Sequence, residues 1–263
     1  MSALSGSPEG AAVTGLDATR VAVPGDDVAA AEVPELPEQA RVEAREIMAR
    51  YPRARSALLP MLHLVQSEEG YVSPDGITLC AEELDLTKAE VGAVATFYTM
   101  YRRKPAGTYH VGVCTNTLCA VMGGDAIFES VKDHLGIGNN ETTADGTVSL
   151  EHIECNAACD YAPVVMVNWE FYDNQTPASA RELVDGLRAG TPAAPTRGAS
   201  SLCTFKEMSR VLAGFPDGRA GEGVQAGPAT LVGLELAQQR GETAPAYPDG
   251  TVPGAVVTKD AQQ

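Results

Sequence analysis

The feature that most constrains this chain is a set of four cysteines that occur as two pairs. The pairs are Cys114 with Cys119, in a C-x4-C spacing, and Cys155 with Cys159, in a C-x3-C spacing. Each pair follows a run typical of a β-strand, at residues 109–113 and 148–153. Because strand-end loops carry the chemistry of many α/β folds, we expect the four thiolates to converge on loops where two neighbouring strands end.

Three chemistries use such a quartet. A [2Fe–2S] cluster takes four soft thiolates, two per iron, and a structural zinc site also accepts four cysteines at these spacings. Two disulfides are disfavoured, because no signal peptide is evident and disulfides do not persist in a reducing cytosol. The C-x-x-C of a thioredoxin-type dithiol is absent. Small or polar loop residues such as Thr115 and Asn156 favour the cluster over zinc, because backbone N–H groups can then approach the sulfurs.

Composition narrows the possible partners. The 263 residues carry a net charge of −16, and the isoelectric point is about 4.6. Without a basic stripe to neutralise phosphates, nucleic-acid binding is excluded and docking on an anionic membrane surface is disfavoured. No run approaches the roughly 18 apolar residues that span a bilayer. We therefore expect a soluble protein that reaches a membrane only through partners.

The N-terminal residues 1–37 lack a periodic apolar face and are rich in Ala, Gly, Val and acidic residues, which predicts a disordered tail. Arg20 is the one basic residue in this range, whereas a mitochondrial transit peptide is Arg-rich and acid-poor. This composition favours a bacterial cytoplasmic protein.

Residues 38–105 show helical periodicity, and we expect a small helical bundle. Ser73 followed by Pro74 is typical of a helix N-terminus, and Thr87 with Glu90 matches a capping box.

Three potential ligands outside the quartet are assigned no metal role. Cys80 falls on an apolar helical stripe, which favours a small buried hydrophobe. His63 has no second ligand nearby in sequence and is interpreted as a surface or packed histidine. Cys203 lies outside both pairs.

From residue 106 the apolar period changes to that of strands. Strands are expected at residues 109–113, 148–153, 163–168 and 169–172, with helices at 124–135 and from 176 to a stop at Gly190. The order β-α-β-β-α is that of a thioredoxin-like domain, at residues 106–190. The expected fold class is therefore α+β, in which a helical bundle precedes a thioredoxin-like α/β domain and both termini are extended tails.

The C-terminal residues 191–263 are rich in Gly, Ala, Pro and Thr, and two patterned pieces interrupt them at residues 202–215 and 229–239. Neither piece can build a core alone, so we expect them to pack on a partner or on the main domain, with disorder as the alternative. A partner-docking role is predicted for the helical bundle and for the tail, on the evidence of four apolar residues in the first piece, Phe205, Met208, Leu212 and Phe215.

Several separated stretches between residues 38 and 190 resemble the small [2Fe–2S] subunit of the NADH-dehydrogenase module of respiratory complex I, the NADH:quinone oxidoreductase. The stretches are YPRARSALLP (51–60), EGYVSP (69–74), VATFYTM (94–100), VCTNTLC (113–119), EC (154–155) with Cys159, and APVV (162–165). Where many members of that family have Leu-Gly-Ala-Cys-Gly, this chain has Asn156-Ala157-Ala158-Cys159-Asp160. Ala157 and Asp160 are expected to alter the loop and to add negative charge beside the cluster.

The resemblance implies that Cys114, Cys119, Cys155 and Cys159 bind one [2Fe–2S] cluster. It implies that the cluster lies near the FMN of a larger partner subunit, which also binds NADH, in a complex with an adjacent iron–sulfur subunit. The complex would be peripheral on the cytoplasmic side of the bacterial plasma membrane. Two alternatives stay open: the related subunit of an NAD-linked formate dehydrogenase or hydrogenase, and a zinc-stapled interaction module without redox function.

No catalytic residue is assigned, and the chain alone is expected not to oxidise NADH. A dinucleotide site needs a Gly-rich turn between a strand and a helix, and residues 122–125 (MGGD) lack the G-x-G-x-x-G pattern. Asp125 would also place a negative charge beside a phosphate. These glycines are interpreted as a turn that starts a helix close behind the first cysteine loop.

Overall fold

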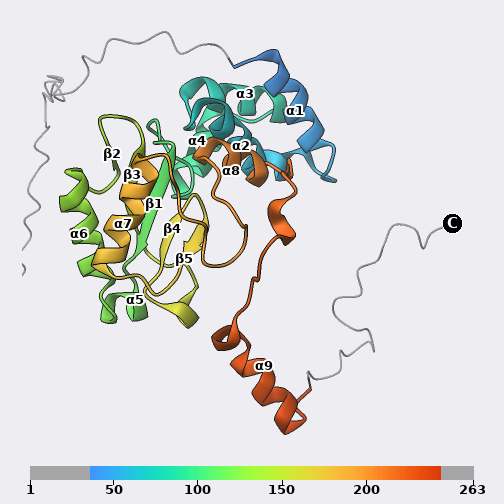
Figure 1. The fold of residues 1–263 in the computed structure, drawn as a ribbon. Helices are drawn as coiled ribbons and strands as arrows, with labels where there is room; N and C mark the ends of the chain where they lie inside the picture. Colours follow the sequence, from blue (N-terminus) through green and yellow to red (C-terminus); the bar gives the residue numbers. More distant parts are fainter. Residues whose placement is uncertain (1–35, 244–263) are drawn as a thin grey trace, which may run out of the picture. The chain divides into compact units, whose positions relative to one another are not determined.

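The computed structural model describes residues 36–243, where a helical bundle precedes a mixed sheet that two helices cover on one face (Figure 1). The expected tails, 1–37 and the end of 191–263, fall largely outside the described residues. The bundle elements are α1 (Glu38–Met48), η1 (Ala54–Ala57), α2 (Leu58–Glu69), α3 (Pro74–Leu84) and α4 (Lys88–Phe97). Within the described part of the chain, no helix is long and apolar enough to span a membrane.

Two helices of the bundle, α3 and α4, start with the local capping contacts that the sequence predicted. The Ser73 hydroxyl accepts a hydrogen bond from the Gly76 N–H at 2.9 Å, and Pro74 occupies the first helical position of α3. At α4, the Thr87 hydroxyl accepts from the Glu90 N–H while the Glu90 carboxylate accepts from the Thr87 N–H, which completes a capping box.

Cys80 and His63 both pack inside the bundle. Cys80 is fully buried in the apolar core, and burial raises the pKa of its thiol to about 12. His63 is also buried, and the loss of water lowers its pKa to about 4, so the ring is neutral at physiological pH. Both residues therefore behave as core side chains.

The sheet has the strand order β2-β3-β1-β4-β5, and helices α6 and α7 pack together on one of its faces (Figure 1). The elements are β1 (Tyr109–Cys114), α5 (Thr117–Val121), α6 (Gly124–Leu135), β2 (Glu141–Thr142), β3 (Val148–Ile153), η2 (Cys159–Tyr161), β4 (Val165–Val167), β5 (Glu170–Tyr172) and α7 (Pro177–Arg188). β1 runs parallel to β3 and antiparallel to β4. The predicted α+β class is confirmed, with α5 and β2 added to the expected order.

The β4–β5 hairpin turns at Asn168 and Trp169, where the sequence predicted strand residues. Both residues have left-handed backbone angles, with φ of 49° and 65°. The buried Asn168 side chain accepts a hydrogen bond from the His110 N–H and donates to the carbonyls of Thr108 and Cys203. These long-range contacts, which no local pattern shows, hold the turn in place.

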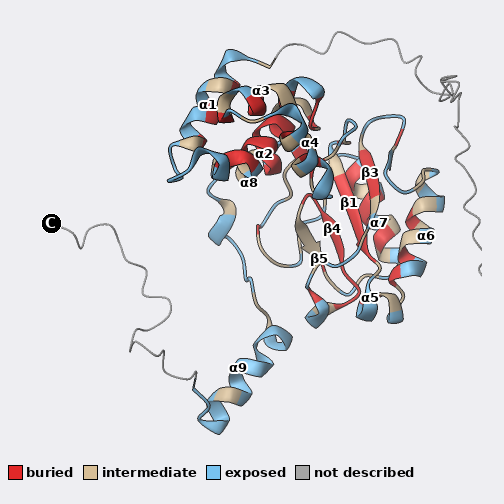
Figure 2. Cartoon of the chain, turned by 180° about the vertical axis from the view of Figure 1, so that it is seen from behind, coloured by how far each residue is buried: buried red, intermediate tan, exposed pale blue. Residues whose placement is uncertain are grey.

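The C-terminal segment returns to the body of the protein. It contains α8 (Phe205–Leu212), η3 (Arg219–Gly221) and α9 (Pro228–Arg240). α8 packs on α2, where Phe205 is 1% exposed and stacks on Trp169 at 5.4 Å between ring centroids. Figure 2 shows the contrast between this buried segment and α9, which buries no residue.

The first patterned piece was expected to pack either on a partner or on the main domain. The structure has α8 on the main domain. Phe205 and Met208 are buried within the chain and are not available to a partner. An ion pair stabilises the contact, because both terminal guanidinium nitrogens of Arg210 lie 2.9 Å from the Glu43 carboxylate of α1.

The burial of Phe205 generates a stability prediction. Phe205→Ala removes a fully buried ring between Trp169 and His110 and should lower the free energy of unfolding by about 3–5 kcal/mol. Leu212→Ala, on the exposed side of the same helix, should cost much less. Urea denaturation of both variants measures the difference; equal, small losses would contradict the packing described for α8.

Candidate metal centre

The first cysteine pair lies where β1 ends and the chain enters a short helix. Cys114 is the last residue of β1 and Cys119 lies within α5. Both are buried, and they form a small cluster with Ala162. The sequence predicted a loop at Cys119; the structure has a helix there, because five residues are too few to show a periodic apolar face.

The second pair follows β3, the parallel neighbour of β1. The register pairs Cys114 with Ile153, and the Thr115 N–H donates to the Ile153 carbonyl at 3.1 Å. Cys155 is therefore two residues beyond the partner of Cys114. The expectation that both pairs lie at neighbouring strand ends is met by this register.

A backbone N–H group approaches a sulfur atom in the second pair. The Ala157 N–H lies 3.2 Å from the Cys155 sulfur, in a loop where Ala157 adopts a left-handed φ of 51°. A side chain in this region costs roughly 1–2 kcal/mol relative to glycine. At the first pair, the Val164 carbonyl accepts a hydrogen bond from the Cys114 N–H at 3.2 Å.

The four sulfurs do not meet at a single point. Among residues 36–243, no group of three or more His, Cys, Asp or Glu side chains is placed to hold one metal ion. Cys114 and Cys119 are buried, whereas Cys155 and Cys159 are exposed, and all four are free of disulfides. The first pair is therefore enclosed by the protein, whereas the second pair faces solvent.

The thiols influence one another electrostatically. Burial is the main cause that raises the pKa of the Cys119 thiol to about 11; the neighbouring Cys114 and Cys159 thiols add to the increase, and the backbone of Val164 opposes it. Because a metal binds the thiolate, a metal bound at this sulfur would have to displace its proton.

Asp160 is one of the two residues of the second loop at which this chain departs from the family pattern. Nearby residues compensate the negative charge of its carboxylate. Its carboxylate accepts a hydrogen bond from the Thr230 hydroxyl and lies 3.1 Å from the Arg197 guanidinium. The hydrogen bond from Thr230 and the neighbouring Arg197 hold the pKa of Asp160 below its usual range. Sequence reasoning missed both partners, because each lies far along the chain with no motif to mark it.

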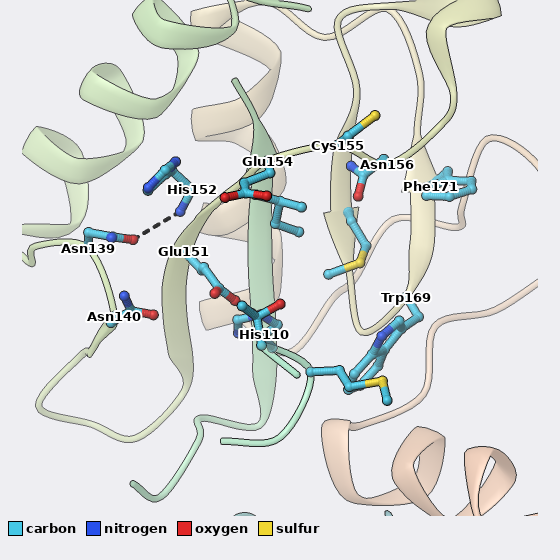
Figure 3. A pocket seen from close by; sticks show the side chains of 14 residues that line it. His110, Asn139, Asn140, Glu151, His152, Glu154, Cys155, Asn156, Trp169 and Phe171 are labelled. Atoms are coloured by element: carbon cyan, nitrogen blue, oxygen red, sulfur yellow. Dashed lines mark hydrogen bonds and ion pairs between the residues drawn. The ribbon is translucent and has the colours of Figure 1, made fainter. Parts of the chain in front are cut away.

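A pocket of about 620 Å³ opens beside the second cysteine loop, on the sheet face that α6 and α7 leave uncovered (Figure 3). Cys155 and Asn156 lie at one end of it, and His110 and Glu151 lie at the other. The Glu151 carboxylate is 2.9 Å from His110 Nε2 and 3.0 Å from Arg102. No sequence motif marks these residues, because His110 and Glu151 meet through the pairing of β1 with β3 and Arg102 reaches them from a loop.

Comparisons with known proteins agree with this geometry. The family model described as thioredoxin-like [2Fe–2S] ferredoxin matches residues 44–188. A NADH-quinone oxidoreductase subunit of Mycobacterium tuberculosis (strain H37Rv) is 64% identical over 217 residues, which are 82% of this chain and 85% of that protein.

More distant proteins match a smaller part of the chain. The corresponding NADH-quinone oxidoreductase subunit of Rickettsia bellii is 40% identical over 148 residues, which are 55% of this chain and 89% of that protein. A solved NAD⁺-reducing [NiFe]-hydrogenase overlaps with a TM-score of 0.46 at 21% identity, covering 51% of this chain and 23% of that chain.

The first cysteine pair depends on a glycine at the start of α6. A Cβ at Gly124 would lie 2.4 Å from the Cys114 carbonyl oxygen and 2.9 Å from that of Cys119. Gly124→Ala should therefore displace both cysteines and lower the free energy of unfolding by about 1–3 kcal/mol. Gly92→Ala in α4, where a Cβ meets nothing, should be neutral or stabilising. Denaturant titration compares the two, and an equally tolerated Gly124→Ala would contradict the close approach.

Proposed function

The chain belongs to the thioredoxin-like [2Fe–2S] ferredoxin family, with close relatives among the NADH-quinone oxidoreductase subunits, and we propose that it transfers electrons within such a complex. The proposed ligands of its cluster are Cys114, Cys119, Cys155 and Cys159. The observation that carries the proposal is the parallel register of β1 and β3, because it brings both cysteine pairs to one edge of the sheet. Both pairs lie within residues 44–188, which the family model matches.

The residues around the sulfurs have distinct tasks in this proposal. When bound, the cluster supplies one-electron redox chemistry. The buried Cys114 and Cys119 exclude water from one side of the site, whereas the exposed Cys155 and Cys159 bring the other side close to the protein surface. The hydrogen bond from the Ala157 N–H stabilises negative charge on the Cys155 sulfur, which favours the reduced state.

The proposed partner is a subunit that binds FMN and NADH, with an adjacent iron–sulfur subunit beyond it. Hydride carries two electrons and a [2Fe–2S] cluster takes one, so a flavin has to stand between NADH and this chain. The complex is proposed to be peripheral on the cytoplasmic side of the plasma membrane. The exposed apolar residues of α9, including Leu231 and Leu234, are the part of the C-terminal segment that retains a docking role in this proposal.

A place in NADH-quinone oxidoreductase is favoured over the two alternatives. The Mycobacterium relative that bears this name is 64% identical and matches 82% of the chain, so the likeness extends well beyond the cysteine loops. The family model that matches residues 44–188 describes a [2Fe–2S] ferredoxin, which favours the cluster over a zinc staple.

Substitution of single cysteines tests the ligand assignment. Serine at Cys114, Cys119, Cys155 or Cys159 should abolish or strongly alter the EPR signal of the reduced cluster, because a thiolate ligand is lost. Cys80→Ala and Cys203→Ser serve as matched controls and should keep the signal. A folded control variant without the signal would show that the assignment is wrong.

We expect this chain to have no flavin site of its own, and an assay of NADH oxidation without the partner subunit tests this expectation. The purified chain with its cluster should not turn over NADH with ferricyanide and should contain no bound FMN. The turn at the start of α6 supports this expectation, since it lacks the G-x-G-x-x-G pattern and Gly124 backs onto Cys114. Turnover by the isolated chain, or one flavin per chain, would contradict the proposed division of tasks.

A further inference from the structure

We propose that the C-terminal residues 191–230, here called the clamp segment, hold the second cysteine loop in place, with Arg197 as the positioning residue. The inference rests on the proposed function, because it takes Cys155 and Cys159 as cluster ligands. The clamp segment lies entirely beyond residues 44–188, so the family match assigns it no role.

Arg197 forms the first contact of the clamp segment. Its side chain is only 13% exposed, and its guanidinium lies 3.1 Å from Asp160 and 2.9 Å from Asp173. The same guanidinium lies over the rings of Tyr161 and Phe171, at 5.4 and 5.1 Å from their centroids. A β-bridge between Arg197 and Phe171 fixes its backbone beside β5. Arg197 therefore ties Asp160 and Tyr161, the two residues after Cys159, to the sheet edge.

The start of α9 forms the second contact, on the same two residues. The Thr230 hydroxyl donates to the Asp160 carboxylate at 2.5 Å, and the Ala229 N–H donates to the Tyr161 hydroxyl at 3.3 Å. The backbone approaches so closely that a Cβ at Gly227 would lie 2.2 Å from the Tyr161 hydroxyl oxygen. Contacts from two separate parts of the clamp segment thus converge next to Cys159.

The second loop needs such support more than the first. Cys114 and Cys119 are fixed by β1, by α5 and by burial, whereas Cys155 and Cys159 are exposed and the loop between them includes the strained Ala157. A charge-assisted contact with a largely buried guanidinium holds a loop more firmly than an ion pair in water. Arg197 also offsets the negative charge of Asp160 beside Cys159, so its removal makes adding an electron to the site harder.

Arg197→Ala in the full-length chain tests the proposal with three readouts. The cluster should be lost to a chelator roughly tenfold faster, a factor that corresponds to about 1.4 kcal/mol. The reduction potential in an EPR titration should become more negative. In the cluster-free chain, residues 155–161 should exchange their amide hydrogens faster. Arg197→Lys should keep the reduction potential close to that of the wild-type chain, because it retains the positive charge. It should still release the cluster faster than the wild-type chain, because it loses the planar contacts of the guanidinium.

Arg188→Ala is the matched control, since Arg188 pairs with Asp145 at an exposed site away from the cysteines. Two further variants separate the loop from the general stability of the fold. Asp160→Asn should loosen residues 155–161 and make the potential more positive, whereas Asp173→Asn, which removes the other partner of Arg197, should leave the potential nearly unchanged.

The proposal is overturned if Arg197→Ala matches Arg188→Ala in all three readouts, or if Asp173→Asn loosens residues 155–161 and Asp160→Asn does not. Failure of the proposed function has a different signature, because the wild-type chain would then hold no cluster. Hydrogen exchange in the cluster-free chain would still decide whether the clamp segment holds the loop.

Discussion

The parallel pairing of β1 with β3 is the constraint on which the site depends. Because Cys114 pairs with Ile153, two chain segments more than thirty residues apart in sequence leave the sheet at the same edge and in the same direction. The antiparallel strand β4 then brings Val164 against the first pair, where its carbonyl accepts from the Cys114 N–H. A shift of this register by one residue would turn every side chain of the strand to the opposite face and separate the two pairs.

The two halves of the site reach their rigidity in different ways. The first pair is supported by the core, since α6 approaches it so closely that only glycine fits at position 124. The second pair lies at the surface, where support comes from charge and from aromatic contacts around Arg197. In a chain with a net charge of −16, a partly buried arginine beside the cysteines also lessens the local negative charge. Placement of the exposed pair near the surface suits electron exchange with another protein of the complex.

Local sequence signals predicted the elements well, because capping and periodicity act over a few residues. The capping box at Thr87, the strand that starts at Tyr109 and the helix that ends before Gly136 all follow from such signals. What the sequence did not show depends on contacts between distant residues. Trp169 adopts a φ of 65° because Asn168 bonds to β1 and to Cys203, and no turn motif marks it. The packing of α8 on α2 and the Arg197–Asp160 pair likewise exist only in the folded chain.

The central claim is that the two cysteine pairs hold one binuclear cluster, and metal analysis of the purified full-length chain tests it most directly. The account predicts two irons and two inorganic sulfides per chain, in a red-brown protein whose visible absorption bleaches with dithionite. A colourless, folded chain that holds one zinc per molecule would contradict it, because the four cysteines would then serve a structural ion and not electron transfer.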